Sequence, residues 1–210
     1  MESFYCVRNP YLTRSSVVNF ISIFLCVFIV KIKDNFDLIP TYIWAYIIFS
    51  LIMWILSILI STGYLFDNKG KFNLLYLNFY LIFNIVFGLL IPLNTSLIYF
   101  IQMSGEPNAD MLYWYINLVI LIVNILGLYL FSVIEFEIYN LKNKIIKYIG
   151  ILLVICSELA LFYLYITAPT VDEAYKGFMF EGLFLFAVDL IIARMFLHYS
   201  IAKDEINGMD

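Results

Sequence analysis

Six long apolar segments are the feature that most constrains this chain. Because a backbone in lipid must satisfy its own hydrogen bonds, apolar segments of this kind cross membranes as helices. About 20 mainly apolar residues in an α-helix span the hydrocarbon core of a bilayer, which is about 30 Å thick. The sequence therefore predicts an all-α integral membrane protein, a bundle of six transmembrane helices over approximately residues 16–32, 40–62, 72–91, 111–134, 145–168 and 178–200.

The composition also favours a membrane protein. Of the 210 residues, 64% are hydrophobic and 13% are charged, whereas a soluble domain carries about 25% charged residues. No connector between the apolar segments is long enough for a soluble domain, so we expect one transmembrane domain over residues 1–210, surrounded by a lipid bilayer. The net charge of −4 argues against direct binding of nucleic acid.

The basic residues predict the orientation of the bundle. If the N-terminus is inside, the outer connectors hold only Lys31, Lys33 and Lys176 of the 12 Lys and Arg residues. Cytoplasmic loops of membrane proteins carry an excess of Lys and Arg, so we expect both termini in the cytoplasm. The Ile-, Asn-, Phe- and Tyr-rich composition suggests a low-GC genome. We therefore expect a bacterial inner, cytoplasmic membrane.

Two acidic residues lie deep in the last two apolar segments. Glu158 is ten residues before the end of segment 145–168, and Asp189 is eleven residues after the start of segment 178–200. The connector between these segments is short, so they are expected to be antiparallel neighbours. Both carboxyl groups then lie roughly 15 Å below the same membrane surface. Ionisable residues at this depth are costly and mark functional sites by default.

Three interpretations of this acidic pair are open. In the first, the two carboxyl groups share a proton or bind a cation, since burial and mutual repulsion both disfavour two adjacent negative charges. In the second, both are protonated and donate hydrogen bonds between helices. In the third, they face different neighbours, because depth alone does not fix the rotation of a helix. Glu181 lies within a turn of the outer surface and is expected to reach water.

Two asparagines lie at a similar depth in other segments, Asn84 in segment 72–91 and Asn124 in segment 111–134. With Glu158 and Asp189 they form a candidate polar belt that could line a cavity. Amides in transmembrane bundles commonly hold helices together through interhelical hydrogen bonds. For the asparagines themselves we favour this structural role.

Arg194 and His198 lie four residues apart near the cytoplasmic end of the last segment. Arg194 can extend its guanidinium group to the headgroups, and its spacing from Asp189 does not favour an ion pair. His198 is the only histidine, and it lacks the matched partner that catalysis requires. The sequence contains no HExxH, GxSxG or CxxC motif. We therefore expect no catalytic residue, no metal site and no cofactor.

Two stretches allow more than one structure. Pro92 follows the third apolar segment, and residues 92–101 either extend that helix past a kink or lie in the membrane interface. Residues 135–144 form a mixed-charge connector that could continue the preceding helix.

Three functions fit these features. We favour a membrane subunit that acts as an anchor, sensor or pore component of a multi-protein system without catalysis of its own. Small proteins of bacterial defence, immunity or export operons can look like this. Such a subunit would form a homo-oligomer and bind a cytoplasmic protein partner at residues 1–15, 63–71, 135–144 and 201–210. The alternative is a small proton- or cation-coupled transporter or channel that uses the Glu158/Asp189 pair. An intramembrane enzyme is the third and least favoured function.

Overall fold

The computed structural model describes residues 2–9, 16–33, 36–64, 73–104, 112–139, 143–169 and 176–208. All regular secondary structure in these ranges is helical, as the sequence predicts. A short 3₁₀ helix, η2 (Phe36–Leu38), precedes the third α-helix. The α-helices are α1 (Glu2–Arg8), α2 (Ser16–Lys33), α3 (Thr41–Ser61), α4 (Leu74–Met103), α5 (Leu112–Glu135), α6 (Lys144–Thr167) and α7 (Lys176–Asn207).

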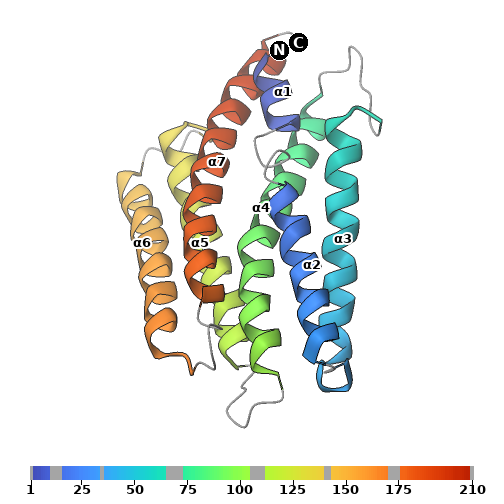
Figure 1. Cartoon of the computed structure of the whole chain (residues 1–210). Helices are drawn as coiled ribbons and strands as arrows, with labels where there is room; N and C mark the ends of the chain where they lie inside the picture. The colour runs from blue at the N-terminus through green and yellow to red at the C-terminus, as the bar shows by residue number, and fades with distance from the viewer. Residues whose placement is uncertain are drawn as a thin grey trace.

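Helices α2 to α7 run along the bundle in alternating directions, and the two ends of the chain lie at the same end of it (Figure 1). Four of these helices, α3, α4, α5 and α6, are long and apolar enough to cross a bilayer. Helix α2 is a shorter apolar helix, and α7 carries Glu181, Asp189 and Arg194 among its apolar residues. Within the described ranges, the fold is therefore a helical bundle with four helices compatible with membrane spans.

Helix α4 continues through Pro92, so residues 92–101 extend this helix. Proline lacks the N–H that would bond to the carbonyl group four residues earlier. Two hydroxyl groups in the turn after the proline bond back to carbonyl groups at and next to it. Thr95 Oγ1 donates to Pro92 O at 2.6 Å, and Ser96 Oγ donates to Leu93 O at 2.8 Å. Residues 90–97 are all buried, so the neighbouring helices hold this stretch in place.

Helix α5 ends at Glu135, and the connector after it does not continue the helix. Glu137 has a φ of 50°, a left-handed conformation that interrupts the helical path. Two side chains of α7 bond to this turn. Ser200 Oγ donates to Phe136 O at 2.6 Å, and Lys203 Nζ donates to Ile138 O at 2.7 Å. The last part of α7 therefore holds the end of α5.

The start of the chain is built into the bundle, because α1 packs against α4 and α7. Phe4 and Val7 are buried, and the rings of Phe4 and Tyr80 meet edge-to-face with centroids 5.9 Å apart. Helix α1, which belongs to a segment expected to dock a cytoplasmic partner, is thus packed against the rest of the bundle. Other described residues of those segments are exposed, such as Tyr64, and residues 1, 10–15, 65–71, 140–142 and 209–210 lie outside the described residues.

Helices α5 and α6 cross in direct backbone contact at two facing glycines. A Cβ added to Gly150 would lie 2.6 Å from Gly127 O, and one added to Gly127 would lie 2.8 Å from Gly150 O. Small residues at a crossing let transmembrane helices approach closely. The two glycines therefore make α5 and α6 a tight pair.

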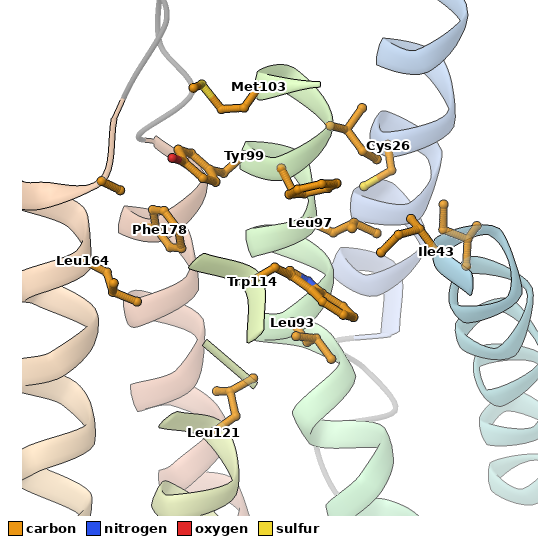
Figure 2. Close-up of a cluster of buried hydrophobic side chains, with 14 of the residues drawn as sticks. Cys26, Ile43, Leu93, Leu97, Tyr99, Met103, Trp114, Leu121, Leu164 and Phe178 are labelled. Atoms are coloured by element: carbon orange, nitrogen blue, oxygen red, sulfur yellow. The ribbon is translucent and has the colours of Figure 1, made fainter. Parts of the chain in front are cut away.

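Buried apolar side chains form two clusters at different levels of the bundle. The distal cluster, away from the chain termini, draws on α2 to α7, with Cys26, Ile43, Leu97, Trp114, Leu164 and Phe178 among its members (Figure 2). The terminal cluster includes α1 and the last turns of α7, with Phe4, Tyr80, Leu128, Ile192 and Phe196 among its members.

Candidate functional site

A layer of polar side chains lies between the two apolar clusters. On α5, Asn124 falls between Leu121 of the distal cluster and Leu128 of the terminal cluster. Each of the helices α2 to α7 contributes at least one polar residue near this level. These residues include Asn19, Ser50, Asn94, Asn124, Glu158 and Asp189, of which all except the half-buried Glu158 are buried.

Asp189 on α7 is held by an amide of α5. Only 7% of Asp189 is exposed, and Asn124 Nδ2 donates to Asp189 Oδ2 at 2.9 Å. The other carboxyl oxygen, Oδ1, has no hydrogen-bond partner among the described residues. A buried carboxyl oxygen without a partner is costly, so this atom is free to take a proton or a ligand.

Glu158 on α6 lies beside Asp189. The two side chains line one groove of about 320 Å³, and they are close enough for their charges to interact. Glu158 Oε1 is buried and has no hydrogen-bond partner in the part of the chain that the structure describes. The structure thus brings together three residues of the predicted belt, Glu158, Asp189 and Asn124.

Glu181 is a third acid of this site, and its position differs from the one expected from the sequence. It was expected to reach water, but its side chain is fully buried. It interacts electrostatically with Glu158, and Asn117 of α5 is its amide neighbour. Neither carboxyl oxygen of Glu181 meets hydrogen-bond geometry with any described residue. The sequence spacing could have indicated that Glu181 faces Asn117. Asn117 and Asn124 are seven residues apart on α5, and Glu181 and Asp189 are eight apart on α7, so the second pair can repeat the contact of the first.

Asn84 lies away from the acids. Its Nδ2 donates to Val7 O at 2.8 Å, so it binds the end of α1. Val7 belongs to the terminal cluster, and Asn84 is buried at that level on α4. Asn84 therefore has the helix-joining role that the sequence analysis favoured for the asparagines.

Asn94 is the centre of a second polar group, which the sequence analysis did not identify. Asn94 Nδ2 donates to Ser50 Oγ at 2.7 Å and also to Asn19 Oδ1. Tyr46 OH donates to Asn94 Oδ1 at 2.7 Å, and Cys26 Sγ lies 3.8 Å from Asn94 O. One asparagine of α4 therefore joins α2 and α3 across the polar layer.

Tyr46 connects the two halves of the polar layer. Its hydroxyl group bonds to Asn94, and its side chain is near enough to Glu181 for an electrostatic interaction. Tyr46 therefore lies near both the polar group around Asn94 and the buried acid Glu181.

Arg194 and His198 lie near each other toward the terminal end of α7. Arg194 Nε donates to His198 Nε2 at 3.5 Å, a long hydrogen bond between neighbouring turns. Both residues therefore lie on the same side of α7, about one and a half and two and a half turns beyond Asp189.

The acidic site has the chemistry of a proton or cation site. It offers carboxyl oxygens from three residues, and Asp189 Oδ1, Glu158 Oε1 and both oxygens of Glu181 lack partners among the described residues. No group of three His, Cys, Asp or Glu in the described ranges is arranged to hold a metal ion. Comparison with protein-family models, with curated proteins and with solved structures found no match.

Proposed function

We propose that this chain is a small proton-coupled membrane transporter with six spans and both ends in the cytoplasm. In this proposal Glu181, Glu158 and Asp189 carry the proton through the apolar interior. The observation that supports it best is Glu181, a fully buried acid beside the amide of Asn117 whose carboxyl oxygens make no hydrogen bond of good geometry with the described residues. Buried acids inside membrane bundles commonly form proton relays.

The order of the acids along the bundle suggests a path. Glu181 is eight residues before Asp189 on α7, which separates them by about 12 Å along the helix axis. Glu158 of α6 interacts with both of them. A proton that enters from the distal end would therefore meet Glu181 first, then Glu158, then Asp189. Each step needs only one unpaired carboxyl oxygen, whereas a bare metal ion needs several ligands.

Proton flux into liposomes tests this proposal. We expect the purified protein, reconstituted with a pH-sensitive dye inside the vesicles, to speed equilibration of an imposed pH gradient. Glu181→Gln keeps the size of the side chain but cannot release a proton, so its flux should fall to the level of empty vesicles. The matched control is Glu135→Gln, because Glu135 lies at the end of α5 and pairs with Lys147. Normal flux in a folded Glu181→Gln protein would refute the proposal.

A membrane subunit of a larger assembly is the second candidate. The observation that favours it is the half-buried position of Glu158 on the surface between α6 and α7. A carboxyl group beside lipid is costly, and a helix of a second copy or of another protein would cover it. Native mass spectrometry of the protein in mild detergent distinguishes the two candidates, since a stoichiometric partner or a homo-oligomer supports the subunit function.

A further inference from the structure

A groove on the side of the bundle leads from the lipid-facing surface to the acidic site. It has a volume of about 320 Å³ and lies between α5, α6 and α7. Its rim is apolar and open: Ile155 is 51% exposed, and Phe186 and Leu190 are each 60% exposed. In a membrane these three side chains face the hydrocarbon core. The groove is therefore reached sideways from the bilayer.

The inner end of the groove is acidic. Glu158 and Asp189 line it together with apolar side chains such as Val154 and Ala193. Asp189 is only 7% exposed, and its Oδ1 has no hydrogen-bond partner in the described ranges. The groove thus has an apolar wall, an unpaired carboxyl oxygen at its base and a second carboxyl group beside it.

A second groove lies on the distal side of Glu158. It has a volume of about 460 Å³ and also has Glu158 in its lining, with Phe162 and Leu183 on its walls. Gly182 lies in this lining, and a Cβ added there would meet nothing within 4 Å. The two grooves meet at one carboxyl group, so Glu158 is accessible from both.

We propose that the groove between α6 and α7 binds an organic cation whose charge is surrounded by apolar groups and which enters from the lipid. This inference rests on the proposed function, because it names the class of substrate that the same acids would bind. Charge complementarity favours this occupant: an apolar cation places its charge on Asp189 and Glu158 and its substituents against the apolar wall. The volume lies at the lower end of the range for small-molecule pockets, about 300 to 1,000 Å³.

Equilibrium binding of tetraphenylphosphonium to the protein in nanodiscs tests this inference. This cation is apolar and enters bilayers, and tetraphenylborate is an anion of the same shape. We expect saturable binding of the cation above the level of empty nanodiscs and no saturable binding of the anion. Asp189→Asn should weaken cation binding roughly tenfold or more, since it removes a charge that is partly desolvated. Ala193→Phe should also weaken it, because the larger side chain fills the groove.

The control is Glu135→Gln, which removes a carboxylate outside the groove and should leave cation binding unchanged. Equal binding of the two tetraphenyl ions, or unchanged cation binding in folded Asp189→Asn and Ala193→Phe proteins, would overturn the inference. The inference would also be overturned if the wild-type protein bound no cation because a second copy covers the groove. Proton flux is measured separately. A protein that carries protons but binds no cation contradicts only this inference, and one that binds the cation without proton flux contradicts only the proposed function.

Discussion

At the scale of single residues, a few amides and carboxyl groups decide how the interior is organised. Asn94 is buried, and its side chain bonds to Asn19, Ser50 and Tyr46 on two other helices. In an apolar interior these partners have no water to replace a lost bond. Asn94 is therefore expected to contribute to stability more than a hydroxyl group that bonds within its own helix.

We predict that Asn94→Leu lowers the free energy of unfolding by about 1–3 kcal/mol, because it leaves buried donors and acceptors on α2 and α3 without a partner. Ser96→Ala is the matched control in the same helix, since Ser96 Oγ bonds to Leu93 O, one turn earlier in its own helix. Thermal unfolding in detergent measures both variants. An equal loss in the two proteins would mean that the interhelical bonds of Asn94 add nothing.

The acidic pair could be predicted from the sequence, but the third acid could not. Equal depth on antiparallel neighbours was enough to suggest that Glu158 and Asp189 are close. Glu181 is only five residues into α7, and a residue so near a helix start would normally reach water. Here α4 covers this start: a Cβ on Gly177 would lie 2.8 Å from Tyr99 Cβ. The position of a residue within its own helix does not reveal whether a neighbouring helix covers it.

At the scale of helices, α6 makes close backbone contact with one neighbour and borders open space beside another. The Gly127–Gly150 crossing joins α6 to α5, whereas Gly182 on α7 faces open space in the groove. Substitution by alanine is therefore expected to change the stability in opposite directions at the two kinds of glycine.

We expect Gly150→Ala to destabilise the protein by about 1–3 kcal/mol, because its Cβ would lie 2.6 Å from backbone atoms of α5 and would push the helices apart. Gly182→Ala should leave stability unchanged or raise it by up to about 1 kcal/mol, because alanine favours the helix. Unfolding in a denaturing detergent series compares the two. The packing argument fails if Gly182→Ala proves the more harmful change.

The six long apolar segments correspond to helices α2 to α7, but the sequence left the path of α4 after Pro92 open and did not predict two other helix features. Helix α4 passes Pro92 because burial and two hydroxyl groups hold the stretch after it. Helix α7 extends to Asn207 because its polar end is held from outside: Tyr199 OH donates to Asn78 Oδ1 at 2.6 Å. Helix α1 forms from a short polar-aromatic stretch because α4 and α7 cover it. In each case tertiary contacts override local preference.

At the scale of the whole molecule, the three cysteines report the orientation of the bundle. Cys26 is buried and Cys156 is exposed in the middle of α6, where lipid would surround it. Cys6 is partly exposed and lines a crevice between α1 and the end of α3. If the chain termini lie in the cytoplasm, Cys6 alone meets water, and it does so on the cytoplasmic side.

A membrane-impermeant maleimide should therefore label the protein in inverted vesicles and leave it unlabelled in right-side-out vesicles. Cys6→Ser should abolish the labelling, and Cys156→Ser should leave it unchanged. Labelling from the outside would reverse the orientation inferred from the basic residues. Labelling that persists in Cys6→Ser would show that water reaches α6, contrary to a membrane position for Cys156.

The packing of α1 has a consequence for synthesis of the protein in the cell. The ribosome makes α1 well before α7, yet α1 packs against both α4 and α7. At about 5–20 residues per second, the chain needs roughly 10–40 s between the two events. Until α7 is in place, Phe4 and Val7 lack part of the surface that buries them. Helix α1 is therefore secured only after α7 has been made, and a chain truncated before α7 would expose α1 to quality-control proteases.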